Sequence, residues 1–175
     1  GGNVFVDDLV ATLTIDLEGV SGVRFELHTD DGAAGTAGGL VEYSNNQSGE
    51  FSIDVLKNSY DLVFSKGAKT KVVDAIDCYG NTCNAGDIVA TLSFDLGSLS
   101  GVRVELHTNN GLPGSAGGLV EYYNNRSGLV SFDVLRNFYD VVVSKGGATG
   151  IADGVDWIEF ASDHGMQDRP MMSVA

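Results

Sequence analysis

The stretch SGVRFELHT at Ser21–Thr29 recurs almost unchanged as SGVRVELHT at Ser100–Thr108. Within it, apolar and polar residues alternate, with Val23, Phe25 and Leu27 on one face and Arg24, Glu26 and His28 on the other. Alternation with a period of two is typical of a β-strand that buries one face. The repetition poses a second question, namely whether the histidines are working residues in two sites or whether a whole structural unit was copied.

The copied region is long. An offset of 79 residues aligns Leu9–Asp77 with Ile88–Asp156 without a gap, and roughly 41 of the 69 positions are identical. A period of this size indicates two tandem domains rather than a solenoid, although so small a domain is marginal alone. We expect repeat 1 over residues 1–79, a disulfide-containing linker over 80–87, repeat 2 over 88–160 and a C-terminal tail over 161–175.

The rest of each copy also has strand character. Alternation predicts two further strands with inward apolar residues, one with Ala11, Leu13, Ile15 and Leu17 and one with Phe51, Ile53 and Val55. In a third strand, Tyr60, Leu62 and Phe64 face away from Asp61 and Val63. We expect a last strand over Thr70–Asp77. Segments rich in Gly, Asn and Asp, such as Asn45–Gly49, predict turns between them. No segment has a helical period. The expected fold class is all-β, with two tandem Ig-like or prealbumin-like antiparallel β-sandwich domains that arose by internal duplication.

The order of these motifs resembles the prealbumin-like family, which includes carboxypeptidase regulatory-like domains and the Cna-B-type repeats of bacterial or archaeal cell-surface proteins. The matching elements are Gly101–Leu106, Gly128 with Phe132 and Val134, Tyr139–Val143 and Gly146, and in the first copy Gly22–Leu27, Gly49–Val55, Tyr60–Phe64 and Gly67. Leu56–Ser59 departs from the Pro-Gly or Ala-Gly turn that the family usually has before the Tyr. The first strand has no Lys, so we expect no Lys–Asn isopeptide bond of the kind found in some Cna-B-type repeats.

Composition restricts the partners. The formal net charge is -14, and such a surface repels nucleic acid and anionic membranes. No apolar stretch is long enough to span a bilayer. Because the chain begins Gly1-Gly2, without Met, we expect it to be a mature or excised segment of a longer product.

The histidines give little support for an enzyme. His28 and His107 lie at equivalent strand ends, two residues after Glu26 and Glu105, and that spacing is ordinary surface pairing. No nucleophile motif, zinc motif or cofactor fingerprint is present. We therefore expect a non-enzymatic protein with no certain cofactor, in which the histidines are polar-face residues that were copied with the domain.

Carboxylates suggest Ca²⁺ as the one cofactor to consider. Acidic residues gather near the joins between the copies, and hard oxygen ligands at domain junctions suit Ca²⁺. The candidate ligands are Asp74, Asp77, Asp87, Asp153 and Asp156, with Asp7 and Asp8 nearby. Asp30 and Asp31 in the loop TDDGAAGTAGG are a second candidate site, although they become Asn109 and Asn110 in the other copy. The alternatives are solvated strand ends that discourage edge pairing, and an ordinary Asp-Gly turn.

The two cysteines indicate the compartment. Cys78 and Cys83 bracket the short stretch YGNT, which a structural disulfide can close, and a disulfide implies an oxidising, extracellular location. The second copy has Trp157 and Ser162 at these positions. We therefore expect its end to meet another surface, and the candidate interface residues are Trp157, Ile158 and Phe160, with Val4 and Phe5 at the other end of the chain.

Two N-x-S sequences are candidate glycosylation sites. Asn46 and Asn125 occupy equivalent positions in predicted turns, and turn chemistry alone also explains an asparagine there.

Two functions remain from these observations. The first is an extracellular structural protein, a subunit or repeat segment of a surface fibre, filament or stalk that self-associates through its chain ends. The second is a carbohydrate- or calcium-dependent adhesion module of a larger secreted protein, with cell-surface or extracellular polysaccharide as its partner. The second requires an exposed aromatic platform, for which Tyr43, Tyr122 and Tyr123 in the VEYSNN and VEYYNN turns are the candidates.

Overall fold

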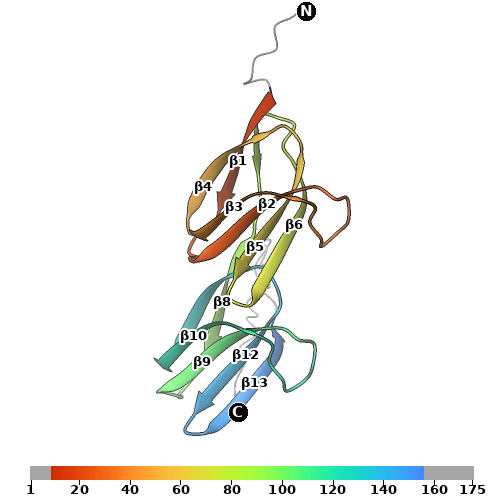
Figure 1. Ribbon diagram of the computed structural model, residues 1–175. Helices are drawn as coiled ribbons and strands as arrows, with labels where there is room; N and C mark the ends of the chain where they lie inside the picture. The colour runs from red at the N-terminus through yellow and green to blue at the C-terminus, as the bar shows by residue number, and fades with distance from the viewer. Residues whose placement is uncertain (1–8, 156–175) are drawn as a thin grey trace, which may run out of the picture. The chain divides into compact units, whose positions relative to one another are not determined.

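The computed structural model describes residues 9–155, and these residues form β-strands and no α-helix (Figure 1). The prediction of an all-β chain is confirmed. The chain divides into two compact units near Val89, and each is described separately below. In this part of the chain no helix has the length and apolar character needed to cross a membrane.

The first unit contains two sheets. Its strands are β1 (Val10–Asp16), β2 (Val23–Thr29), β3 (Leu40–Gln47), β4 (Glu50–Leu56), β5 (Ser59–Lys66), β6 (Lys69–Asp77) and β7 (Thr82–Asn84). One sheet has the order β4-β1-β7 and the other the order β3-β2-β5-β6. The β1–β4, β2–β3 and β2–β5 pairs are antiparallel, whereas the short β7 runs parallel to β1.

The second unit repeats most of this arrangement. Its strands are β8 (Val89–Asp95), β9 (Val102–Thr108), β10 (Leu119–Arg126), β11 (Leu129–Leu135), β12 (Tyr139–Lys145) and β13 (Ala148–Val155). The four-stranded sheet has the order β10-β9-β12-β13, equivalent to that of the first unit. The other sheet is β11-β8, so among the described residues β8 has a neighbour on one side only.

Each unit has a core between its two sheets, built from the apolar faces that the alternation predicts. Leu13 and Ile15 of β1 and Phe25 of β2 are fully buried. The Phe25 ring contacts Phe51 of the opposite sheet at 5.5 Å between centroids, and Phe64 of its own sheet at 5.6 Å. In the second unit Phe132 contacts Phe94 and stacks on Tyr123 at 4.6 Å. The predicted inward faces of these strands are therefore correct.

The predicted turn at Asn45–Gly49 is shorter than expected. β3 continues to Gln47, which pairs with Val23, so that only Ser48 and Gly49 connect it to β4. Gly49 has a φ of 63°, a conformation that glycine adopts without steric cost. Asn45 and Asn46 lie at a register shift between the pairs Phe25↔Ser44 and Val23↔Gln47, so the strand continues through a β-bulge before it ends.

The segment treated in the sequence analysis as a linker contains part of the first unit. β7 lies within it and pairs with β1 through Thr12↔Thr82, Leu13↔Cys83 and Thr14↔Asn84. The Cys78–Cys83 disulfide is present, with 5.2 Å between the Cα atoms. The bond therefore ties β7, which pairs with β1, to the residue that follows β6.

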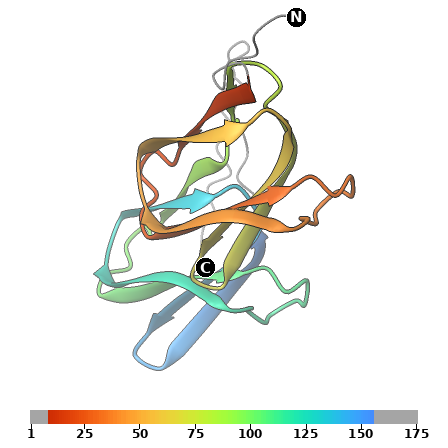
Figure 2. The same ribbon diagram turned by 45° about the horizontal axis from the view of Figure 1, so that its top comes forward.

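In each four-stranded sheet, the longest loop connects one edge strand to the strand that pairs with it. Residues 30–39 link β2 to β3 and residues 109–118 link β9 to β10, and both loops project beyond the strands (Figure 2). The first of these loops contains Asp30 and Asp31, the second predicted Ca²⁺ site.

Candidate functional site

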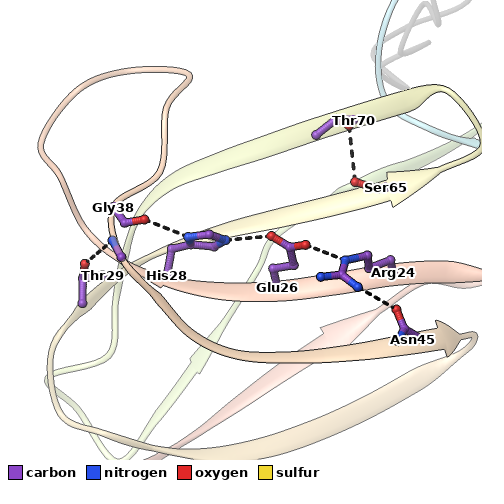
Figure 3. Close-up of polar contacts among 9 residues, drawn as sticks. Arg24, Glu26, His28, Thr29, Gly38, Asn45, Ser65 and Thr70 are labelled. Carbon is purple, nitrogen blue, oxygen red and sulfur yellow. Dashed lines mark hydrogen bonds and ion pairs between the residues drawn. The ribbon is translucent and has the colours of Figure 1, made fainter.

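The most connected polar group of the first unit lies on the outer face of β2, beside the β2–β3 loop. We call it the polar strip, and it comprises Arg24, Glu26 and His28 of β2 with Asn45 of β3 (Figure 3). Tyr43 of β3 belongs to it as well, through its contact with Arg24. The period of two places the three β2 side chains on one face, and the antiparallel register Glu26↔Tyr43 brings the β3 residues beside them.

Hydrogen bonds run along the strip without a break. Arg24 Nε donates to Glu26 Oε1 at 2.5 Å, and Arg24 Nη1 donates to Asn45 Oδ1 at 3.1 Å. His28 Nε2 lies 2.9 Å from Glu26 Oε2, while Nδ1 lies 2.9 Å from the carbonyl oxygen of Gly38 in the loop (Figure 3). The Arg24 guanidinium also covers the Tyr43 ring, with Cζ 4.6 Å from its centroid.

The charges of this strip follow from its geometry. The hydrogen bond from His28, followed by that from Arg24, lowers the pKa of the Glu26 carboxyl. Burial alone would lower the pKa of His28, but the hydrogen bonds to Gly38 and Glu26 outweigh it and raise that pKa. A carbonyl and a carboxylate can only accept hydrogen bonds, so both contacts of the ring are hydrogen bonds only when Nδ1 and Nε2 each carry a proton. The strip therefore favours an imidazolium that links strand to loop.

Three further side chains hold the loop. Thr29 Oγ1 accepts a hydrogen bond from Gly39 N at 2.9 Å, and Asp74 of β6 accepts one from Gly35 N at 2.9 Å. Asp61 of β5 accepts from Asp31 N at 3.1 Å and from Ala75 N at 3.0 Å. Because β2, β5 and β6 all contribute, the loop is fixed by the sheet as well as by its own turns.

Asp61 is a residue whose role the sequence reasoning missed. Alternation placed it with Val63 on the face opposite the core, yet its exposed fraction is only 1% and both carboxylate oxygens accept backbone N–H groups. A carboxylate can be buried at low cost when hydrogen bonds satisfy it. The signal available in the sequence was the pair Tyr60-Asp61, repeated as Tyr139-Asp140.

The second unit reproduces these contacts. Asp140 is 0% exposed and accepts from Asn110 N and Gly154 N, Asp153 accepts from Gly114 N, and Thr108 accepts from Gly118 N. Arg103 pairs with Glu105 and covers the Tyr122 ring, with Cζ 4.2 Å from its centroid. His107 Nδ1 contacts Gly117 O at 2.9 Å, whereas its Nε2 lies 3.4 Å from Glu105. The loop support is thus duplicated together with the strands.

Among the described residues, three carboxylates converge where the β2–β3 loop meets β5. Within residues 9–155, the group of three or more side chains with metal-ligand spacing is Asp30, Asp31 and Asp61, whose oxygens lie within 4.8 Å of one another. These oxygens already accept hydrogen bonds, for example from Gly32 N, Ala33 N and Thr36 Oγ1. In the second unit the equivalent side chains are Asn109, Asn110 and Asp140, which leaves one carboxylate in place of three.

The acidic residues proposed for a junction site have other roles where the structure describes them. Asp74 and Asp153 accept hydrogen bonds from the loops, and Asp77 accepts one from Tyr79 N. Neither these three nor Asp87 belongs to the described carboxylate group. Asp156 lies outside the described residues.

The three tyrosines considered as an aromatic platform separate into two kinds. Tyr43 and Tyr122 lie within β3 and β10 and have exposed fractions of 53% and 46%. Tyr123 stacks on the buried Phe132 and so contributes to the core. The expectation that they sit in turns was wrong, because both strands extend beyond them.

Both candidate glycosylation sites lie on the surface. Asn46 and Asn125 are exposed and have φ values of 58° and 53°, a left-handed conformation that asparagine tolerates. Backbone geometry therefore accounts for asparagine at both N-x-S sequences.

The candidate interface residues all lie outside the described part of the chain; they are Val4, Phe5, Trp157, Ile158 and Phe160.

Comparisons with known proteins identify no family. No family model matches the chain, and no curated protein matches it. Among solved structures it is similar to "The Bacillus anthracis TIE protein", with 11% sequence identity and a TM-score of 0.29. That similarity covers 85% of this chain and 32% of the other, so this chain spans about a third of that protein's length.

Proposed function

We propose that this chain is a non-enzymatic structural segment of an extracellular fibre, filament or stalk, built from two tandem prealbumin-like β-sandwich domains. One observation carries the proposal, which is that the duplication retains the residues that support the fold. Buried Asp61 and Asp140 perform the same backbone contacts, while Asp30 and Asp31 are replaced by asparagines. Selection for a shared binding chemistry would be expected to keep the carboxylates, whereas selection for a rigid repeat needs only the scaffold.

The polar strip supports a structural reading. The Glu26–His28 pair is the nearest approach to an acid–base pair, but both nitrogens of the ring contact acceptors of the protein. A general base needs a free nitrogen within reach of a substrate proton. The pair is therefore better suited to fastening the loop than to proton transfer.

The disulfide supports the extracellular location. Disulfides persist mainly in oxidising compartments, and this one adds a strand to a small domain that has limited core of its own.

The test is the native mass of the protein, measured by light scattering before any denaturation. A mass many times 18.3 kDa, with elongated particles in electron micrographs, is the expected result for a self-associating segment. A monomer over a wide range of concentration would contradict self-association through the chain ends.

A second candidate function, a calcium- or carbohydrate-dependent adhesion module, is favoured by two observations. The carboxylates of Asp30, Asp31 and Asp61 lie close together, and Tyr43 is exposed beside Arg24. Calorimetric titration with Ca²⁺ and with polysaccharide tests this reading. The control is the Asp30→Asn/Asp31→Asn variant, which copies the second unit. Binding that survives both this change and Tyr43→Ala/Tyr122→Ala would exclude these sites.

A further inference from the structure

The second unit contains the one Asn-Gly pair of the sequence, Asn110-Gly111, at the start of the β9–β10 loop. The loop projects beyond the strands of its sheet (Figure 2), and both residues are exposed. Nothing lies within 4 Å of the position that a Cβ on Gly111 would take. Because glycine has no side chain beside its nitrogen, that nitrogen can approach the side chain of the preceding asparagine with little steric hindrance.

The reaction that this arrangement permits is deamidation. Gly111 N gives up its proton to hydroxide and forms a bond to Asn110 Cγ, while the Cγ–Nδ2 bond breaks. The amide nitrogen takes a proton from water, which restores the hydroxide, and leaves as ammonia. A second water molecule opens the resulting succinimide ring, either at Cγ to give an aspartate or at the main-chain carbonyl carbon to give an isoaspartate. The net reaction consumes water, releases ammonia and needs no oxidant or reductant.

Three hydrogen bonds of the loop oppose this attack. Gly111 N donates to Asn109 Oδ1 at 2.7 Å, which holds the attacking nitrogen. Asn110 Nδ2 donates to Ser115 Oγ at 2.9 Å, and Asn110 Oδ1 accepts from Leu112 N at 2.8 Å, so the amide is held as well. All three bonds are exposed to water, where one hydrogen bond contributes little net free energy. The loop therefore slows the attack without preventing it.

The first copy shows that a loop of this kind accepts an aspartate. Asp31 takes the place of Asn110 there, and its carboxylate accepts hydrogen bonds from Ala33 N at 2.9 Å and from Thr36 Oγ1 at 2.8 Å. These two contacts, of which that with Ala33 is the stronger, lower the pKa of the Asp31 carboxyl. The Asp61 carboxylate lies within 4.8 Å of it, so a second negative charge is also compatible with the loop.

The second loop has equivalent donors for a carboxylate at position 110. Leu112 N already binds Asn110 Oδ1, and the Ser115 hydroxyl, which accepts from the amide, can donate to a carboxylate. We propose that Asn110 is a site of spontaneous deamidation, that the hydrogen bonds of the loop set its rate, and that the loop keeps its shape around the aspartate product. Each conversion adds a negative charge to the chain. The proposal goes beyond the structural role proposed for the chain and does not depend on it.

Peptide mapping of the full chain after ageing at mildly alkaline pH tests the site. We expect the mass increase that accompanies exchange of the amide nitrogen for oxygen to accumulate at Asn110. Asn45 and Asn124 are internal controls, because both are exposed but are followed by another asparagine instead of glycine. A faster increase at either control would overturn the proposal. So would an unchanged Asn110 under conditions in which a peptide with the sequence of residues 106–115 deamidates.

Two variants test the part played by the loop. Asn109→Ala removes the acceptor of Gly111 N, and Ser115→Ala removes the acceptor of the Asn110 amide. Each is expected to raise the rate at Asn110 about two- to tenfold, the factor that corresponds to one such hydrogen bond. Ser93→Ala is the matched control, because it removes an exposed hydroxyl from the other sheet of the same unit. Rates equal to that of this control would show that the loop does not set the rate.

Asn110→Asp tests whether the loop keeps its shape around the product. We expect its thermal midpoint to match that of the unaltered protein, because Leu112 N and the Ser115 hydroxyl bind the carboxylate as their equivalents bind Asp31. A clear fall in the midpoint, together with faster amide exchange at Leu112, would mean that the loop does not accommodate the product. That result would overturn this part of the proposal even if Asn110 deamidates.

Discussion

At the scale of single residues, a few polar side chains decide the shape of the longest loop. Asp61 is the clearest case, since one buried carboxylate accepts hydrogen bonds from the loop at Asp31 and from β6 at Ala75. Ala75 has a φ of 54°, which is uncommon for a residue with a Cβ, and the carboxylate compensates part of that cost by binding its N–H. In the second unit Asp140 accepts the equivalent hydrogen bond from Gly154 N. Glycine adopts a positive φ without steric cost, so no strain has to be compensated there.

Replacing the buried carboxylate is expected to be costly. Asp61→Ala leaves two backbone N–H groups without an acceptor, and each unsatisfied group costs about 1–3 kcal/mol. We expect the free energy of unfolding to fall by about 3 kcal/mol in urea denaturation. Asp54→Ala is the control, because Asp54 is an exposed carboxylate that accepts a hydrogen bond from the Thr12 hydroxyl, and it should cost less than about 1 kcal/mol. Equal losses for the two variants would show that burial of Asp61 is unimportant.

His28 makes the stability of the first unit depend on pH. Its pKa is raised in the folded state, so its contribution is fully present below the unfolded pKa, near 6.5, and is lost as the pH rises through the folded value. The Glu26 pKa is lowered, so that contribution is present above about 4.5 and is lost as the pH falls through the folded value. The pair is expected to stabilise the fold most between these limits.

The measurement is the thermal midpoint of the protein and of His28→Gln at pH 5.5 and pH 8. The deficit of the variant should shrink at the higher pH, where the wild-type imidazole has lost its charge. An NMR titration of the ring gives the folded pKa directly. A value at or below 6.5 would contradict the charged link between strand and loop.

At the scale of secondary-structure elements, the disulfide and β7 act together. Sequence reasoning predicted the bond from the short spacing of Cys78 and Cys83, and the structure confirms it. It did not predict that Thr82–Asn84 pairs with β1, because three residues carry no periodicity that distinguishes a strand from a loop. The pairing is parallel and is made with a strand about 70 residues earlier, so only the tertiary fold places the two together.

Removing the disulfide should loosen β7 selectively. For so short a loop, chain-entropy arguments give a loss of about 2 kcal/mol for Cys78→Ser/Cys83→Ser. Amide exchange at Thr12 N–H, which is bonded to Asn81 O, should accelerate more than exchange at the β2–β5 ladder. If Thr12 keeps its protection in the variant, β7 is held by its own packing and the disulfide is not what fastens it.

At the scale of the whole molecule, the duplication determines the repeated architecture and the net charge determines how copies of the chain interact at long range. The two copies share a strand order in their four-stranded sheets and the same loop supports, so the repeat is one of structure as well as of sequence. The net charge of -14 means that copies of the chain repel one another at long range. Any association between them has to overcome this repulsion.

Self-association is therefore expected to depend on salt. At an ionic strength of about 0.01 M the Debye length is roughly 30 Å, and it falls to about 8 Å at 0.15 M. The native mass measured by light scattering should rise between these two conditions. A mass that falls as salt is added would mean that attraction between opposite charges, and not burial of apolar surface, holds the copies together.

The sequence by itself determined the all-β class, the duplication, the inward faces of the main strands and the disulfide, because each depends on local periodicity or short spacing. The tertiary structure decided the burial of Asp61, the pairing of β7 with β1 and the convergence of Asp30, Asp31 and Asp61. It also placed Tyr123 against the core, whereas Tyr43 and its equivalent Tyr122 are exposed. These features depend on which strands become neighbours, and residues far apart in the chain acquire their surroundings only when the sheets form.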